Sequence, residues 1–383
     1  MSGGLKIPIT PRVLKWARES AGLTVEFVSK DLEVDQKILE GWEKNLDKPN
    51  LSNTERLCFL YKRSLACFML PDVPNEPGPP RDMRLMFGAS GKFDKKTLLV
   101  FRKAHLLQEY TNELLENLNL PNVPLIPKVT LRDDPEKIAI QVREKLGISL
   151  EVQTKKWKDW QQAFEGWRKA VETLNVFVFR FKMPIEDARG FSLKEPNPNV
   201  IVVNSGDGWY ARNFTLFHEF AHLMLNESSV CIPKITNKAS GQIFEIEKWC
   251  NQFSAALLLP KVVFSNNQDV LNLVETADIN LLKSLSKTFK VSCYVFLIRL
   301  ENLGMISFPK CQKMLGDYEK TTKKSKGGGR NPGQAASCIG KLGKKYVSLV
   351  VDSKSSNKIN NKQMSDYLSL SPKYFSDLIS ISG

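Results

Sequence analysis

Two of the three histidines in this 383-residue sequence stand four residues apart, at His218 and His222, and Glu219 follows the first of them. On an α-helix, residues at this spacing share one face, so both imidazoles can reach the same metal ion. Glu219 lies one step round the helix and could take a proton from a nearby water. The pattern His-Glu-x-x-His is typical of zinc hydrolases. The alternative is a core helix whose two histidines bond to backbone carbonyls.

A catalytic zinc ion usually has three protein ligands and one position left for water. The residues after His222 that could supply the third ligand are Glu227, Cys231, Glu245, Glu247 and Cys250. Glu247 is favoured because residues 247–260 predict a second buried helix, on which Glu247 and Asn251 share a face. The Glu-x-x-x-Asn spacing is similar to the Glu-x-x-x-Asp of thermolysin-like zinc enzymes, in which the second residue braces a histidine ligand.

The elements around these residues can be predicted from their composition. Segments 176–179, 189–193 and 200–204 have β-branched or aromatic residues and predict three strands. Segment 215–225 is apolar nearly all round, as expected of a helix inside a domain. Further helices are predicted over 92–119 and 135–146, and two more over 279–304. Trp157, Trp160, Phe164 and Trp167 fall at spacings of three and four, which favours core packing over a ligand site.

Residues 10–68 have apolar residues at helical spacing and predict a bundle of short helices. The Gly-Leu-Thr step at 22–24, Trp42-Glu43 and Pro49 resemble a helix-turn-helix domain of the XRE type. That resemblance implies a recognition helix over about 35–44, with candidate DNA contacts at Gln36, Lys37 and Lys44. Five acidic residues lie between positions 33 and 48, and they oppose contact with phosphates. A protein-docking or regulatory role therefore stays open for this domain.

The net charge of +14 indicates an anionic partner. Residues 310–383 hold 14 lysines and arginines against 5 acidic residues, whereas residues 1–68 hold 11 against 9. The basic, glycine-rich stretch 320–330 is either a solvated linker or a contact for nucleic acid or an acidic partner. The sequence has no long apolar run and no signal segment, and its seven cysteines are widely spaced. These features predict a cytoplasmic protein without a membrane partner.

The central segments resemble the ImmA/IrrE family of metallo-endopeptidases. The resemblance rests on Arg189-Gly-Phe-Ser, Ile201-Val-Val-Asn, Ala211-Arg-Asn-Phe-Thr, His218-Glu-Phe-Ala-His and residues 247–260, and together with the XRE pattern it covers about residues 10 to 305. Residues and resemblance together imply zinc held by His218, His222 and Glu247, with Glu219 as the general base in peptide-bond hydrolysis. The candidates for stabilising the oxyanion are Tyr210, Arg212 and Arg189.

The expected fold class is α+β and mostly helical, with a zincin-like protease domain that holds a small β-sheet. Five prolines between positions 71 and 80 indicate an extended linker. We expect a helix-turn-helix domain at 1–68, a Pro-rich linker at 69–92, a zinc metallopeptidase domain at 93–305, and a basic, helical C-terminal region at 306–383.

The expected function is a zinc endopeptidase that cuts a repressor or other regulatory protein and so controls transcription in a stress or phage response. DNA is a second expected partner, bound through the helix-turn-helix or the basic C-terminal region. One alternative is a DNA-binding regulator whose zinc domain senses a signal with little proteolysis. Another, which the family resemblance also implies, is a component of a toxin-antitoxin module.

Overall fold

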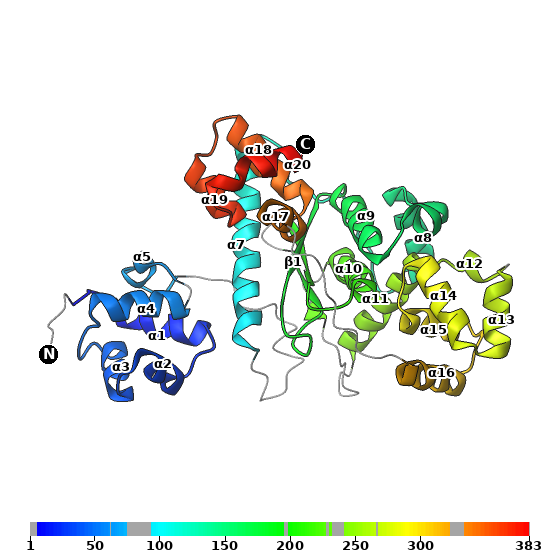
Figure 1. The fold of residues 1–383 in the computed structure, drawn as a ribbon, viewed down its shortest axis with the longest axis horizontal. Helices are drawn as coiled ribbons and strands as arrows, with labels where there is room; N and C mark the ends of the chain where they lie inside the picture. The colour runs from blue at the N-terminus through cyan, green and yellow to red at the C-terminus, as the bar shows by residue number, and fades with distance from the viewer. Residues whose placement is uncertain are drawn as a thin grey trace. The chain divides into compact units, whose positions relative to one another are not determined.

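The computed structural model describes residues 6–61, 63–74, 93–194, 198–226, 230–231, 241–265, 267–321 and 333–382. The chain divides into two compact units, one formed by 1–79 with 87–105 and the other by 80–86 with 106–383. Helices predominate throughout (Figure 1). α7 (Lys95–Asn117) begins in the first unit and ends in the second. No helix in the described ranges is both long enough and apolar enough to cross a membrane.

The first unit is a bundle of short helices, as the spacing of its apolar residues predicted. Its helices are α1 (Pro11–Ser20), α2 (Val25–Leu32), α3 (Gln36–Glu43), α4 (Leu51–Tyr61) and α5 (Leu65–Phe68). Their apolar faces meet in a core that includes Leu14, Leu39 and Trp42. The guanidinium of Arg18 binds both carboxylate oxygens of Glu43, at 2.6 and 2.9 Å, and so ties α1 to α3.

The second unit contains a four-stranded sheet in the order β1-β3-β2-β4. Its strands are β1 (Val176–Phe181), β2 (Gly190–Leu193), β3 (Asn199–Asn204) and β4 (Val230–Cys231). β1 and β3 run parallel, and β2 is antiparallel to both β3 and β4. The three predicted strands are confirmed, and β3 is buried at every residue because both faces of the sheet are covered. β4 was not predicted, since two residues are too short for a recognisable pattern.

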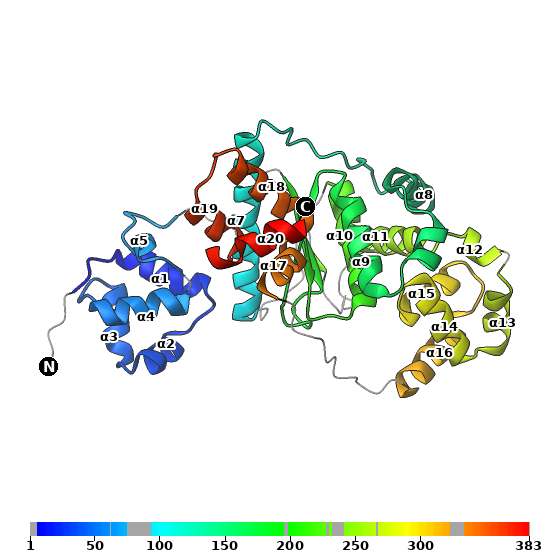
Figure 2. The same cartoon turned by 45° about the horizontal axis from the view of Figure 1, so that its top comes forward.

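Helices cover both faces of the sheet (Figure 2). α9 (Trp160–Glu172) and α10 (Trp209–Met224) lie on one side, and α17 (Gln334–Leu342) lies on the other. α10 packs against α11 (Gln242–Leu258), and α11 packs in turn against α8 (Pro135–Leu146). The remaining elements before residue 322 are η1 (Val152–Lys156), α12 (Val262–Ser265), α13 (Gln268–Thr276), α14 (Ile279–Phe289), α15 (Cys293–Asn302) and α16 (Phe308–Thr321).

Trp157, Phe164 and Trp167 of the aromatic stripe on and before α9 pack in the core, as predicted, whereas Trp160 is half-buried outside it. Phe164 and Trp167 are fully buried. The ring of Trp167 meets the edges of Trp157 and Phe217, with centroids 5.2 and 5.0 Å apart. Such edge-to-face pairs add stability beyond the buried area. They fix α9 against α10, the helix that carries the two histidines.

The C-terminal helices belong to the same compact unit as the sheet. They are α17, α18 (Lys344–Ser355), α19 (Asn361–Leu368), η2 (Pro372–Tyr374) and α20 (Phe375–Ser382). The buried guanidinium of Arg168 donates to the carbonyl oxygens of Gly340 and Lys341, at 3.0 and 3.3 Å, where α17 ends. Lys345 binds the backbone oxygen of Glu172 at 2.6 Å. The apolar run 346–351, whose pattern alone fits either a strand or a buried helix, is helical.

The predicted domain boundaries stay predictions, because the division into two compact units does not test them. The predicted linker lies mostly outside the described residues, as does most of the basic stretch 320–330.

Candidate metal centre

α10 carries the predicted histidine motif in its C-terminal half. His218, Glu219 and His222 are buried, each at most 2% exposed. Because the helix has 3.6 residues per turn, the two imidazoles lie one above the other, with ring centroids 4.8 Å apart. Leu216, Phe217 and Phe220 anchor the other faces of the helix in the core. The motif is therefore held on a rigid element.

α11 brings the predicted third residue to this face. Phe220 of α10 and Phe253 of α11 stack with centroids 6.5 Å apart, which joins the two helices. Trp249, also on α11, donates its indole hydrogen to the backbone oxygen of Asp133 at 2.8 Å and fixes the helix from the other side. Glu247, 6% exposed, then projects towards the two imidazoles.

Three donor atoms converge at this point. The Nε2 atoms of His218 and His222 are 3.1 Å apart, and each lies 3.2 Å from a different oxygen of Glu247. Zinc bonds of about 2.0–2.1 Å in a tetrahedron place neighbouring ligand atoms about 3.3 Å apart. The observed spacing fits one small cation held by all three side chains. In the part of the chain that the structure describes, these residues are the group that could hold a metal ion.

Asn251 fixes the tautomer of one of these imidazoles. Its Oδ1 lies 3.1 Å from Nδ1 of His218. Since an amide oxygen only accepts hydrogen bonds, Nδ1 must carry the hydrogen. The lone pair of His218 is then on Nε2, the atom that faces His222 and Glu247. This is the orientation that binding of a metal requires.

The electrostatics of the site favour positive charge between the three side chains. Burial lowers the pKa of His218, but the charge and hydrogen bond of Glu247 raise it more strongly, so the net pKa lies above its ordinary value. Burial raises the pKa of Glu247, but the two imidazoles lower it well below its usual range. Glu247 is therefore an ionised carboxylate in a buried place, and a divalent cation would satisfy it.

Gly190 brings β2 into close contact with the Glu219 face of α10. A Cβ atom at this position would lie 2.5 Å from Cγ2 of Thr215, 2.9 Å from the backbone oxygen of Val202 and 3.5 Å from Cγ of Glu219. Only glycine fits this approach. The sequence pattern placed Gly190 in a predicted strand and in a family motif but did not reveal this close contact. The signal was there, because glycine inside a strand often marks a close backbone approach.

The three candidates for stabilising the oxyanion lie in different settings. Arg212 donates to the backbone oxygens of Asp207 and Ser205, at 2.9 and 2.7 Å, and so braces the loop before α10. Arg189 pairs with the carboxylate of Asp207 at 3.1 Å. Tyr210 is 46% exposed. The catalytic role of each stays a prediction.

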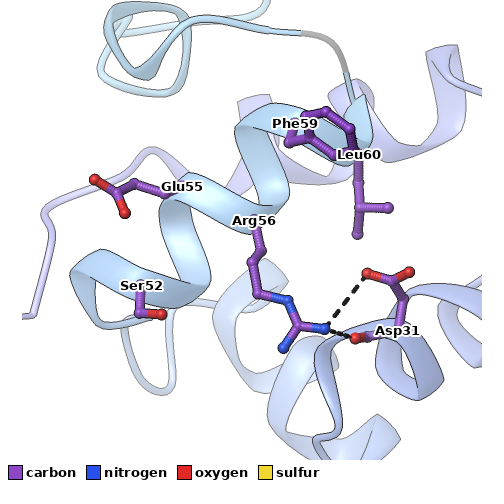
Figure 3. A pocket seen from close by; sticks show the side chains of 6 residues that line it. All are labelled: Asp31, Ser52, Glu55, Arg56, Phe59 and Leu60. Atoms are coloured by element: carbon purple, nitrogen blue, oxygen red, sulfur yellow. Dashed lines mark hydrogen bonds and ion pairs between the residues drawn. The ribbon is translucent and has the colours of Figure 1, made fainter.

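The three predicted DNA contacts lie on or next to α3 in the first unit. Gln36 and Lys37 are exposed, while Lys44 pairs with Glu40 at 2.9 Å. A separate pocket in this unit is lined by Asp31, Ser52, Glu55, Arg56, Phe59 and Leu60 (Figure 3). None of the residues predicted for chemistry or for DNA contact lines it.

Residues 171–301 match a family model, Peptidase_M78, described as the IrrE N-terminal-like domain. The matched stretch begins near the end of α9 and includes the sheet, α10 and α11. It supports the resemblance to the ImmA/IrrE family for this part of the chain and indicates a metal-dependent peptidase domain that acts on protein substrates. A search of curated proteins found no match.

Proposed function

We propose that the chain is a zinc-dependent endopeptidase of the ImmA/IrrE type that cleaves a specific regulatory protein. The observation that carries this proposal is the convergence of His218, His222 and Glu247 in a buried site whose spacing fits a small cation. The peptidase family match over the same stretch supports it. Zinc is favoured because two imidazoles and one carboxylate are a common ligand set of catalytic zinc sites.

In this proposal, the side chains of the chain have separate roles. His218, His222 and Glu247 hold the ion, and Asn251 keeps the lone pair of His218 directed at it. When bound, zinc supplies a Lewis acid that makes a neighbouring water more acidic and polarises the peptide carbonyl. Glu219 takes the proton of the attacking water and gives it to the leaving amine.

Tyr210, Arg212 and Arg189 all stay candidates for stabilising the oxyanion. Arg212 and Arg189 are both occupied at the loop 205–207, whereas the side chain of Tyr210 is half exposed. A tyrosine hydroxyl is a suitable donor for a developing oxyanion.

The proposal is tested by replacing the base without disturbing the metal ligands. Glu219→Gln keeps the size of the side chain but cannot accept a proton. The protein encoded by the neighbouring gene serves as the candidate substrate. Its cleavage should be at least about 100-fold slower with the variant, whereas the zinc content of the variant, measured by mass spectrometry, should equal that of the wild type. A chelator should abolish wild-type cleavage. Cleavage by Glu219→Gln at the wild-type rate would show that Glu219 is not the base.

We propose that the substrate is a repressor or a similar regulator in a stress or phage response, so that cleavage in the cytoplasm changes transcription. The first unit would then be an XRE-type helix-turn-helix domain. The α2–α3 pair supports this assignment, because α2 ends in a tight turn and Asp35 caps α3.

The same helix pair favours a second candidate function, a DNA-binding regulator whose metal site is a sensor. The two functions separate in cells. If the protein acts by cleavage, Glu219→Gln should no longer regulate transcription of the target genes. If the metal site only senses a signal, the variant should still regulate them.

A further inference from the structure

Within the ranges that the structure describes, the same seven-residue turn occurs three times. In each copy a helix ends, one residue takes the left-handed conformation, an apolar residue follows, and a polar residue precedes the next helix. The copies are Ser-Lys-Asp-Leu-Glu-Val-Asp at 29–35, Ser-Lys-Thr-Phe-Lys-Val-Ser at 286–292 and Ser-Asp-Tyr-Leu-Ser-Leu-Ser at 365–371. We call them the first, second and third turns.

Their backbone geometry agrees as closely as their sequences. The left-handed residues are Glu33, Lys290 and Ser369, with φ of 58°, 56° and 49°. In each turn, the amide of the following apolar residue donates to the carbonyl of the first serine. These bonds are Val34 to Ser29 at 3.0 Å, Val291 to Ser286 at 3.1 Å and Leu370 to Ser365 at 3.1 Å. This pattern closes a helix end tightly and redirects the chain. All three turns thus end the first helix in the same way. The second helix starts differently in the third turn, because Asp35 and Ser292 cap α3 and α15 whereas Ser371 makes no capping bond and precedes the short η2.

The helix that follows the second turn is not accessible to a binding partner. α15, which follows it, is largely buried, and Phe296, Leu297 and Leu300 have no exposed surface. Its Arg299 binds Glu136 through two hydrogen bonds. A helix held in this way cannot enter a groove of DNA, so the second turn serves the peptidase core.

The first and third turns differ in charge. Residues 18–46 around the first turn carry four basic and seven acidic residues, a net charge of −3. The equivalent residues around the third turn, 354–382, carry four lysines and two aspartates, a net charge of +2. Because DNA binding depends on neutralising phosphates, the third turn is the better suited of the two.

The lysines near the third turn are exposed, although the Nζ of Lys373 lies 4.9 Å from the centroid of the Tyr374 ring. Lys358 and Lys362 lie just before and within the first turn of α19, and Lys373 lies where the second helix begins; all three are exposed. Within the described ranges none of them pairs with a carboxylate, although Asp366 follows Lys362 by four residues. The second helix, η2 with α20, packs through Leu378 and leaves Ser371, Lys373 and Ser376 exposed.

We propose that the α19–α20 pair is a second helix-turn-helix, and that it binds double-stranded DNA. The exposed start of the second helix, at Lys373 and Ser376, enters the major groove, while Lys358 and Lys362 contact phosphates on the flank. α18, α19 and α20 form one cluster of helices in the C-terminal part of the second unit (Figure 1). This inference does not depend on the proposed peptidase activity.

The test measures binding of the full-length protein to a labelled duplex of mixed sequence by fluorescence anisotropy, from about 50 to 200 mM salt. The test variant is Lys358→Ala/Lys362→Ala/Lys373→Ala. If each lysine contacts one phosphate, the slope of log affinity against log salt should become shallower by about 2.7. Restoring the charge with arginine at the three positions should restore the slope. Circular dichroism should show the same fold for all variants, since these side chains are exposed.

A matched triple variant elsewhere in the second unit is the control. Lys156→Ala/Lys169→Ala/Lys287→Ala removes the same charge at three exposed positions outside residues 354–382. We expect the slope of log affinity against log salt for this control to differ from that of the wild type by less than about one. The proposal is overturned if the wild type does not bind the duplex, if the C-terminal variant binds as the wild type does, or if both variants lose the same amount. Equal losses would mean that total charge, rather than the third turn, determines binding.

Discussion

Replacing Gly190 by alanine is expected to destabilise the second unit and to reduce cleavage. The new Cβ would lie 2.5 Å from Cγ2 of Thr215 and 2.9 Å from the backbone oxygen of Val202, closer than carbon atoms approach such neighbours. β2 and α10 must therefore separate slightly. Overpacking of this kind costs about 1–3 kcal/mol. Because α10 carries Glu219 and both histidines, the same shift disturbs the metal centre.

Thermal unfolding followed by tryptophan fluorescence measures this cost. Five of the seven tryptophans, at positions 157, 160, 167, 209 and 249, belong to the second unit. Each kcal/mol should lower the unfolding midpoint by about 2–4 °C. Gly316→Ala is the matched control, since its Cβ would meet no atom within 4 Å. That control should raise the midpoint or leave it unchanged, because alanine favours a helix over glycine by about 1 kcal/mol.

A second substitution tests the cause. Thr215→Ser removes Cγ2, so Gly190→Ala/Thr215→Ser should recover part of the lost stability, while the contact with Val202 keeps the rest. If Gly190→Ala unfolds at the wild-type midpoint and cleaves at the wild-type rate, the close packing of β2 on α10 is refuted.

Two further predictions concern the metal centre and pH. Asn251→Leu should weaken zinc binding about 10- to 100-fold in a calorimetric titration, whereas Asn251→Asp, which keeps a hydrogen-bond acceptor, should bind zinc nearly as tightly as the wild type. If Asn251→Leu binds zinc as tightly as the wild type, Asn251 does not brace His218. Burial, opposed by Arg168 and Lys345, raises the pKa of Glu172 from 4.5 to about 7. The contribution of Glu172 to the free energy of unfolding is therefore greatest below about pH 4.5, where its carboxyl group is neutral in both the folded and the unfolded state. This contribution is lost as the pH rises through 7, and the loss is up to about 3 kcal/mol. The unfolding midpoint should therefore fall between pH 5 and 8, and Glu172→Gln should flatten this dependence; a wild-type slope in that variant would exclude Glu172 as its origin.

The parts of the fold that sequence predicted are those with a strong local pattern. β1 and β3 are short apolar runs, β3 with β-branched residues between Pro198 and Gly206, and α8 starts after the capping residue Asp134 with Pro135 in its first turn. The run 346–351 was ambiguous because a short apolar run fits either a strand or a buried helix. Its helical state depends on Lys345 and on the contact of Tyr346 with Phe179, which are tertiary interactions.

The metal centre could be predicted in composition but not in arrangement. The spacing of His218 and His222 alone indicated a shared face, whereas Glu247 reaches them only because α10 and α11 pack together. The third turn was missed for a local reason. Its left-handed residue is Ser369 rather than glycine, so the usual signal of a helix end is missing.

The packing of α8 and α9 bears on how this peptidase can be divided. The family match begins at residue 171, yet Val142, Phe164 and Trp167, which belong to the core around the histidine helix, come earlier in the chain. Arg168 also precedes it and binds the end of α17, far beyond residue 301. A protein cut to the limits of the family match would expose these apolar contacts to water. The stretch that matches the family model is therefore shorter than the stretch that supplies this core.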